Sequence, residues 1–427
     1  MQVRFYNARI LTMEDFNLID GEVWVEENKI TYVGEENDTE AEKRKWDRQI
    51  NANGNLLMPG FKNAHTHSGM TFLRSYADDL PLLDWLQKQV FPMEAKLTPE
   101  DIYYLSILAI MEYLTSGITA NFDMYLTPDT IAQASIDCGF RTVLTSGLND
   151  FTQSIDKLEE YYEKFNSNNE LIRFCLGFHA EYTTSRNLLE GVAKLARKYE
   201  APVFTHNSET KAEVRQCLEK YGVTPTRLFE DVGIYAYGGG GYHCVHMSEE
   251  DLNIFKMNKL TVVTNPGSNV KLASGIAPVQ KMLDLGINVA IGTDGPASNN
   301  CLDMFREMFL TTGLAKLCQE DASAVDAHQV LRMATVGGAI AMGLADCDVL
   351  AKGKNADLIM LDLNQPNMQP LNNIPKNIVY SGSKHNIKLT MVNGKILYED
   401  GRFFIGFQPD TIYKNANDIV RRIKNSI

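Results

Sequence analysis

Eight short runs of β-forming residues alternate with longer helical patterns across the middle of this 427-residue chain. Strands joined by helices cross over the sheet, so they lie parallel instead of forming hairpins. Eight is the number of such strands that closes a sheet into a barrel. The predicted strands are 56–62, 118–123, 141–147, 171–178, 201–206, 234–244, 260–265 and 287–293. The pattern therefore predicts an α/β protein built on a (β/α)8 barrel of the TIM type.

The helices between these strands have recognisable first turns. Thr98 is followed by Pro99 and two acidic residues, which is typical of a capping side chain with proline in the first turn. This helix is expected to run to Gly117. Thr127 and Pro128 begin the next helix in the same way. These boundaries support the alternation of strands and helices.

Both ends of the chain have β character instead. The runs before the barrel are 3–10, 21–25 and 29–33, and those after it are 357–361, 377–380, 387–392 and 395–398. The last two runs are joined by Asn393-Gly394, a strong hairpin signal. We expect these segments to pack into one small β-sandwich beside the barrel. The predicted domains are 1–57 for the first part of the sandwich, 58–345 for the barrel and 346–427 for the second part with a terminal helix.

Charge and composition restrict the partners. A formal net charge of −13 argues against nucleic acid or an anionic membrane surface as a partner. The seven cysteines are scattered and never form a CxxC pair, which indicates a reduced, cytoplasmic protein. No apolar run approaches the roughly 20 residues that span a bilayer. The partners expected are a small-molecule substrate and further copies of the chain in a homo-oligomer.

Histidines gather where the predicted strands end, which is where barrels of this kind carry their chemistry. His65 and His67 lie two residues apart at the end of the first strand, so their side chains point the same way. The other polar strand ends carry His179, His206, His243, His246 and Asp294. Six of the eight histidines thus lie at strand ends, which indicates a metal site. The remaining two, His328 and His385, are expected to be structural.

Three histidines and an aspartate suit Zn²⁺ or Fe²⁺ with one position left for water. The ligands we assign to one divalent metal are His65, His67, His206 and Asp294. Zinc is the expected ion, with iron as the alternative. Glu209 lies three residues beyond His206 and is placed to transfer protons, whereas His243 is expected beside the metal-bound water. His246 is expected to point elsewhere.

Taken together, the motifs resemble those of the amidohydrolase superfamily. They are His65-Thr-His67 after Pro59-Gly60, His206-Asn-Ser-Glu209, His243-Cys-Val-His246, Asn265-Pro-Gly-Ser-Asn269 and Thr293-Asp294-Gly-Pro-Ala-Ser298. Within that superfamily the chain is similar to the S-adenosylhomocysteine/methylthioadenosine deaminases. The likeness covers essentially the whole chain.

The resemblance implies a role for each matching catalytic residue. Asp294 would bind the metal and take the proton of the attacking water. Glu209 would protonate the ring nitrogen beside the carbon under attack, and His243 would hold and polarise the nucleophile. A metal lowers the pKa of its water from 15.7 toward about 7 and so supplies hydroxide at neutral pH. The expected reaction is hydrolytic deamination of an adenine nucleoside, with ammonia released after attack by metal-bound hydroxide.

The resemblance also implies how the substrate is held. Glu94 would accept hydrogen bonds from both ribose hydroxyls, Trp85 would line the nucleoside pocket, His179 would contact the purine, and Ser298 belongs to the same substrate-binding set. One position departs from the family pattern: Ser146 stands where an arginine would pair with the carboxylate of a homocysteine tail. This departure favours methylthioadenosine or adenosine over S-adenosylhomocysteine.

Other functions fit the sequence less well. A binuclear hydrolase needs a bridging lysine at the end of the fourth strand, and 171–181 contains none. A nucleic-acid deaminase would carry an HxE…PCxxC signature, which is absent from the sequence. A deaminase of guanine or another heterocycle and a triazine hydrolase remain alternatives within the superfamily. A non-catalytic scaffold on such a barrel is the alternative from another class, although scaffolds lose ligands that this chain keeps.

Overall fold

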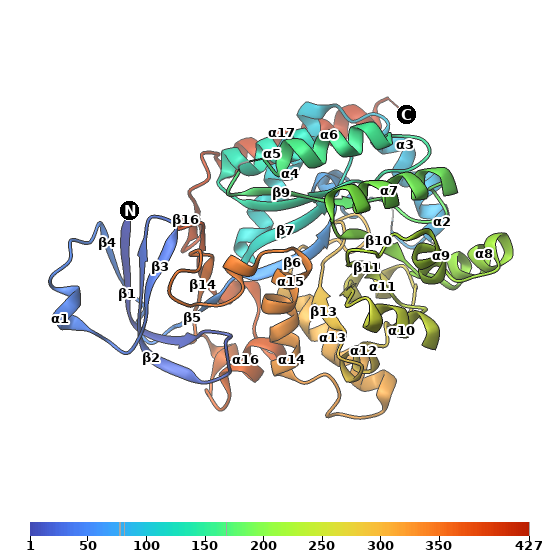
Figure 1. Cartoon of the computed structure of the whole chain (residues 1–427). Coiled ribbons are helices and arrows are strands. Elements are labelled where there is room, and N and C mark those ends of the chain that lie inside the picture. The colour runs from blue at the N-terminus through green and yellow to red at the C-terminus, as the bar shows by residue number, and fades with distance from the viewer. Residues whose placement is uncertain (77, 81, 168, 427) are drawn as a thin grey trace.

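The computed structural model of the chain describes residues 1–76, 78–80, 82–167 and 169–426. Among the described residues, eight parallel strands follow one another in sequence order from β6 to β13 and form a near-closed barrel covered by helices (Figure 1). The strands are β6 (Phe61–Thr66), β7 (Ile118–Met124), β8 (Arg141–Thr145), β9 (Ile172–Gly177), β10 (Val203–Asn207), β11 (Gly239–His243), β12 (Thr261–Thr264) and β13 (Asn288–Ile291). The predicted (β/α)8 barrel is confirmed.

The barrel comes together at the ends of its first and last strands. The backbone N–H of Asp294, just beyond β13, donates to the carbonyl oxygen of His65 in β6 at 3.0 Å. The N–H of Gly292 donates to the carbonyl of Thr264 in β12 at 3.0 Å. Two predicted metal ligands are therefore joined through their backbones, so closure of the barrel fixes their separation.

The helices follow the strands as expected. They are α1 (Asp38–Ala41), α2 (Leu82–Trp85), α3 (Phe91–Glu94), α4 (Pro99–Thr115), α5 (Pro128–Cys138), α6 (Ile155–Phe165), α7 (Arg186–Tyr199), α8 (Lys211–Tyr221), α9 (Pro225–Val232), α10 (Glu249–Met257), α11 (Pro266–Lys271), α12 (Val279–Asp284), α13 (Met304–Gln319), α14 (Ala327–Arg332), α15 (Gly338–Ala341), α16 (Ile374–Tyr380) and α17 (Pro409–Lys424). The predicted start of α4 is confirmed, because Thr98 and Asp101 form a reciprocal capping box there. Within the described residues, no helix is both long and apolar enough to cross a membrane.

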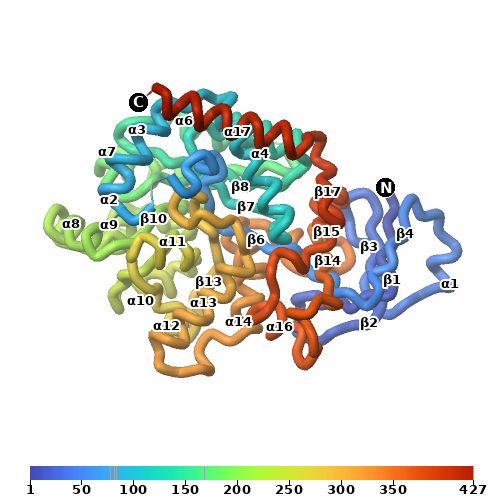
Figure 2. The backbone as a smooth tube through the Cα atoms, turned by 180° about the vertical axis from the view of Figure 1, so that it is seen from behind, coloured from blue at the N-terminus to red at the C-terminus, as the bar shows by residue number. Residues whose placement is uncertain are grey.

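A second sheet combines strands from both ends of the chain beside the barrel (Figures 1 and 2). It consists of β1 (Gln2–Leu11), β2 (Leu18–Glu26), β3 (Lys29–Gly34), β4 (Arg48–Asn51), β5 (Leu56–Pro59), β14 (Leu358–Leu361), β15 (Ile387–Val392), β16 (Lys395–Glu399) and β17 (Arg402–Phe403). The two halves meet where β5 pairs antiparallel with β14. After this sheet the chain returns to the barrel, where α17 packs along α4 and Arg422 pairs with Asp101 (Figure 2).

Two predicted strands differ from the structure. The run 56–62 is two strands, since β5 belongs to the mixed sheet and the barrel begins with β6 after Gly60. At that break a Cβ on Gly60 would lie 2.1 Å from the Thr119 side chain, so only glycine fits. The run 377–380 is the end of helix α16, because the Asn373 side chain accepts from the Lys376 N–H and Pro375 occupies the first turn. The predicted domain limits stay a prediction.

The four-glycine run before His243 has a packing reason. β11 lies between β10 and β12, and its glycines touch the backbones of both neighbours. A Cβ on Gly239 would lie 2.0 Å from the carbonyl oxygen of Val203, and one on Gly240 would lie 2.1 Å from that of Thr261. The glycines therefore allow a close approach that carries His243 to the centre of the barrel.

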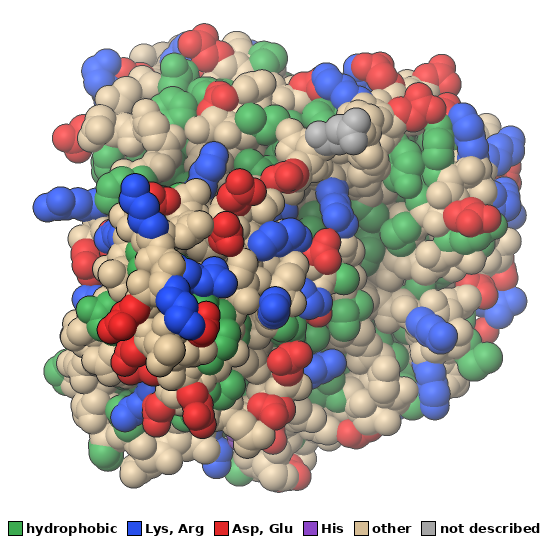
Figure 3. Space-filling model, turned by 60° about the vertical axis from the view of Figure 1, so that its left-hand side comes forward, with side chains coloured by type: hydrophobic (Ala, Val, Ile, Leu, Met, Phe, Trp, Pro, Cys, Tyr) green, Lys and Arg blue, Asp and Glu red, His purple; other side chains and the backbone are tan. Residues whose placement is uncertain are grey.

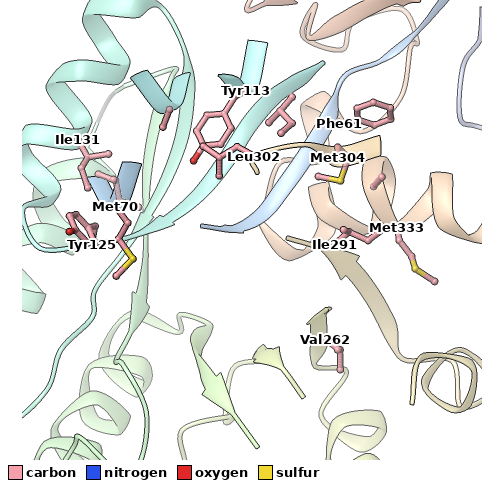
Figure 4. Close-up of a cluster of buried hydrophobic side chains, with 14 of the residues drawn as sticks. Phe61, Met70, Tyr113, Tyr125, Ile131, Val262, Ile291, Leu302, Met304 and Met333 are labelled. Carbon is pink, nitrogen blue, oxygen red and sulfur yellow. The ribbon is translucent and has the colours of Figure 1, made fainter. Parts of the chain in front are cut away.

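Apolar side chains fill the space between barrel and helices. Phe61, Tyr113 and Met304 belong to the main hydrophobic cluster, which connects the start of β6 with α4 and α13 (Figure 4). Acidic and basic side chains are interspersed with apolar ones over the face shown in Figure 3. This packing holds the strand ends, and with them the polar side chains described next, in fixed positions.

Candidate metal centre and active site

Four side chains from different strand ends converge at one point of the barrel. His65 in β6, His206 in β10, His243 in β11 and Asp294 beyond β13 are buried, and their ligand atoms lie within 4.8 Å of one another. His67 adjoins this group, with its Nε2 at 3.1 Å from Asp294 Oδ1. The structure thus brings together all four predicted ligands and adds His243.

The rings of two predicted ligands are oriented by backbone carbonyls. His206 Nδ1 lies 2.7 Å from the carbonyl oxygen of His179, and His67 Nδ1 contacts that of Met124. A carbonyl oxygen can only accept, so Nδ1 carries the hydrogen in both rings. In the neutral form of each ring, Nε2 then has the lone pair that a metal ion needs. This arrangement is typical of metal-binding histidines.

His65 gives the clearest sign that an ion belongs here. It is fully buried, its ring stacks on Tyr242 with centroids 3.7 Å apart, and neither ring nitrogen has a hydrogen-bond partner among the described residues. Buried polar atoms are rarely left unpaired, because the loss of hydration is costly. A divalent cation among these imidazole and carboxylate groups would give one of the two nitrogens a partner, so the residues present fit a metal of the zinc type.

Asp294 is held from both sides. Its Oδ1 faces the Nε2 atoms of His65 at 3.5 Å and His67 at 3.1 Å, and its Oδ2 accepts from Ser268 Oγ at 2.6 Å and Ser298 Oγ at 2.7 Å. Burial raises the pKa of Asp294, but the neighbouring His65 and His67 rings outweigh burial and hold that pKa well below its usual value. The carboxylate is therefore ionised. The Ser298 hydroxyl is engaged with Asp294, and its substrate contact stays a prediction.

Glu209 and His243 face each other beside the cluster. Glu209 Oε2 lies 3.8 Å from His243 Nε2, and Glu209 Oε1 accepts from Ser274 Oγ at 3.3 Å. Asn269 Oδ1 lies 2.7 Å from His243 Nδ1 and orients this ring. Burial raises the pKa of Glu209, so its carboxyl keeps a proton to higher pH than an exposed glutamate. The pair can hold and transfer a proton next to the metal position.

A cavity of about 600 Å³ opens onto these groups, a size suited to a small molecule. Predicted site residues line it: His67, Trp85, Glu94, His179, His206, Glu209, His243, Asp294 and Ser298. His65 lies outside the lining, buried among its neighbours. Among the described residues, no lysine or arginine lines the cavity. Its charged groups are therefore acidic, apart from the histidines.

Unpaired polar atoms mark the side of the cavity formed by α2 and α3. Glu94 Oε1 and Trp85 Nε1 are buried and have no partner among the described residues. Burial raises the pKa of Glu94 to about 7. A ligand with hydroxyl donors would pair with Glu94. His179 lies across the barrel at the end of β9, where burial lowers its pKa to about 4 and keeps its ring neutral.

The structure also shows functional neighbours that sequence reasoning missed. Ser268 contacts Asp294, and Asn269 contacts His243. The sequence motif 265–269 contains both residues but does not predict these contacts. His246 points away from the cluster, as expected, and its Nε2 lies 2.7 Å from the carbonyl oxygen of Ser274. The place of these residues in the sequence does not show which of them contact the site, because the contacts join side chains from different strand ends.

Comparison with known proteins agrees with this geometry. The amidohydrolase family model matches residues 56–397. A 5-methylthioadenosine/S-adenosylhomocysteine deaminase from Caldicellulosiruptor saccharolyticus is 39% identical over the full length of both chains, and one from Thermococcus kodakarensis is 40% identical over 93% of this chain and 94% of its own. An adenosine deaminase from Xanthomonas campestris with bound zinc has a TM-score of 0.93 and 32% identity, covering 99% of this chain and 98% of its own. The chain therefore belongs to the amidohydrolase family.

Proposed function

We propose that this protein is a metal-dependent deaminase of adenine nucleosides, with methylthioadenosine, adenosine and S-adenosylhomocysteine as the substrate class. The observation that carries the proposal is that one cavity joins three features: a buried His/Asp cluster, a buried Glu209, and a Glu94 whose Oε1 has no hydrogen-bond partner among the described residues. The relatives named as deaminases of these nucleosides support the same class.

The side chains supply the proton transfers of such a reaction. A bound divalent ion lowers the pKa of a coordinated water toward about 7. Asp294 would take a proton of the attacking water at Oδ1, while its Oδ2 accepts from the Ser268 and Ser298 hydroxyls. Glu209 gives a proton to the ring nitrogen beside the carbon under attack, and His243 holds the water through Nε2. A carbon–oxygen bond forms, and the amino group takes the proton held by Asp294 and leaves as ammonia when its bond to carbon breaks. The remaining hydroxyl proton returns to Glu209 as the carbonyl of the product forms.

Metal analysis is expected to find one divalent ion per chain, zinc or iron, held by His65, His67, His206 and Asp294. Removal of the ion should lower Tm, because buried ligand atoms such as those of His65 then lose their only partner. His206→Ala should lose the ion. His246→Ala should keep it, since that ring contacts the Ser274 carbonyl outside the cluster.

Two ions per chain, or an ion bound by other residues, would contradict this ligand set. A non-catalytic scaffold would contain no stoichiometric metal. Elemental analysis of the three purified proteins distinguishes these outcomes without a substrate.

The cavity favours a neutral group at the 5′ position of the nucleoside. Ser146 is fully buried, donates to Gln153 Oε1 and accepts from the Leu148 N–H at 2.9 Å, so its hydroxyl is engaged inside the protein. With no lysine or arginine among the described lining residues, the carboxylate of a homocysteine tail would enter the cavity without a cation to pair with.

The ratio of kcat/KM values for methylthioadenosine and S-adenosylhomocysteine is therefore expected to be one or higher. Initial rates of ammonia release measured side by side give this ratio. A strong preference for S-adenosylhomocysteine would show that a basic residue outside the cavity lining reaches the tail, and would leave the deaminase assignment intact.

The whole assignment is tested by an ammonia-release screen over adenosine, methylthioadenosine, S-adenosylhomocysteine, guanine and cytosine. The highest rate of ammonia release should be found with one of the adenine nucleosides. The proposal fails if guanine or cytosine is hydrolysed while every adenine nucleoside is inert. A cytoplasmic location and a homo-oligomeric state stay predictions.

A further inference from the structure

Glu213 contacts the segment that carries Glu209. Its carboxylate is buried near the start of α8, four residues beyond Glu209. Oε1 accepts from the N–H of Ser208 at 2.7 Å, while Oε2 accepts from the N–H of Glu209 at 2.7 Å and of Thr210 at 3.2 Å. Three successive amides of the segment thus donate to one carboxylate. Hydrogen bonds to an ionised acceptor are stronger than those to a neutral one.

The segment held in this way has an unusual backbone. Ser208 has φ +52°, a left-handed conformation that residues with a side chain seldom adopt. Its carbonyl oxygen accepts from the N–H groups of Val245 at 3.1 Å and His246 at 2.9 Å, beyond β11. The segment therefore connects the strand end that carries Glu209 with the one that carries His243. A change in the conformation of Ser208 would alter the 3.8 Å separation of these two side chains.

Glu181, beyond β9, lies next to Glu213 and is itself buried. Burial, and then the neighbouring Glu213 carboxylate, raise the pKa of Glu181 well above its usual value. The three amide donors stabilise negative charge on Glu213, whereas Glu181 Oε2 has no partner among the described residues. Burial also raises the pKa of Glu213, to about 7, which is less than the rise to about 9 for Glu181, so Glu181 is the first of the pair to take a proton as the pH falls.

We propose that Glu213 is a positioning residue for the reaction: it acts through Glu209 by fixing the backbone of 208–210. Its carboxylate contacts the segment through backbone amides and does not line the cavity, so it orients the proton-transfer group without touching the substrate. This inference rests on the proposed function, because it assigns Glu209 a part in deamination.

Glu213→Gln is the variant that tests this role. Glutamine keeps one acceptor oxygen, but its NH₂ group replaces the other and faces a backbone N–H. Two donors cannot pair, so the segment 208–210 should shift. We expect kcat for the best nucleoside to fall by about tenfold, with KM changed by less than about threefold, because a small displacement of a reacting group costs rate more than binding. Metal content should be unchanged.

Asp251→Asn is the matched control. Asp251 is an equally buried capping-box carboxylate at the start of α10, and it accepts from Ser248 and Thr224 instead of from residues of the site. It should lose stability, as measured by Tm, but keep kcat. If Glu213→Gln does not fold, Glu213→Asp, which retains the charge one methylene shorter, takes its place with a smaller expected loss.

A double-substitution cycle separates positioning from a general structural effect. When Glu209 is already glutamine, the change Glu213→Gln should lower kcat by less than about twofold, since the group it positions is gone. The proposal is overturned if Glu213→Gln leaves kcat unchanged, or if Asp251→Asn lowers kcat by as much. It is also overturned if the losses of kcat in the double-substitution cycle are fully additive. If the wild-type protein is inert toward every adenine nucleoside, the proposed function fails instead.

Discussion

Glu209→Gln is expected to lower kcat for the best nucleoside by about 10²-fold or more, the scale of a positioned acid–base group. The glutamine amide has nearly the shape of the carboxyl but cannot deliver a proton to the purine nitrogen. The carboxyl is buried, its raised pKa keeps a proton available, and it lies 3.8 Å from His243 Nε2. Steady-state ammonia release measures the loss.

The variant should otherwise resemble the wild-type protein. Metal content and Tm are expected to be retained, because Glu209 is outside the group of ligand atoms that converge at the cluster. Glu219→Gln, an exposed glutamate on α8, serves as the control for the same chemical change and should have wild-type kcat. Near-normal turnover by the Glu209 variant would remove this residue from the mechanism.

Glu94→Ala is expected to lower kcat/KM for methylthioadenosine or adenosine by at least about tenfold. A carboxylate facing two adjacent hydroxyls accepts both hydrogen bonds, and bonds to charged groups contribute roughly 1.5–3 kcal/mol each. Two bonds at the lower limit amount to about 3 kcal/mol, or about 10²-fold. Glu94 suits this role because it lines the cavity and its Oε1 is buried without a partner among the described residues.

Substrates that lack one hydroxyl make this test specific. The wild-type protein should discriminate against 2′-deoxyadenosine and 3′-deoxyadenosine, and Glu94→Ala should lose that discrimination along with activity on the full nucleoside. Free adenine, if it is turned over, should be nearly unaffected by the substitution. An equal loss on the free base and on nucleosides would show that Glu94 supports the shape of the cavity and does not recognise the sugar.

The barrel could be predicted because its signals are local. Alternation of strands and helices, capping threonines such as Thr98, and proline in first turns are each readable within about a dozen residues. Chemistry in such barrels lies at the carboxyl ends of the strands, and this rule pointed to His65, His206 and Asp294 as metal ligands, although the chain has eight histidines in all. The amidohydrolase resemblance rested on the same strand ends, and the family match confirmed it.

The errors occurred where neighbours in space decide the structure. The run 56–62 was predicted as a single strand, yet it divides at Gly60 into β5 and β6, which join different sheets. Residues 377–380 have strand-like composition but lie in a helix set by the cap at Asn373. Local pattern cannot reveal which sheet a strand joins, or that a cap overrides the β propensity of the residues after it.

The barrel, the strand ends and the residue types needed for a metal and a proton donor follow from the amino-acid sequence, since strand direction and periodicity fix which side chains reach one rim. Which atoms meet at that rim depends on the folded chain. The tertiary structure placed His243 within the cluster, directed the Ser146 hydroxyl into the protein, and brought Glu213 under the backbone of Glu209. The physical reason is that such contacts join segments far apart in the chain, and their distances exist only once the barrel closes between β6 and β13.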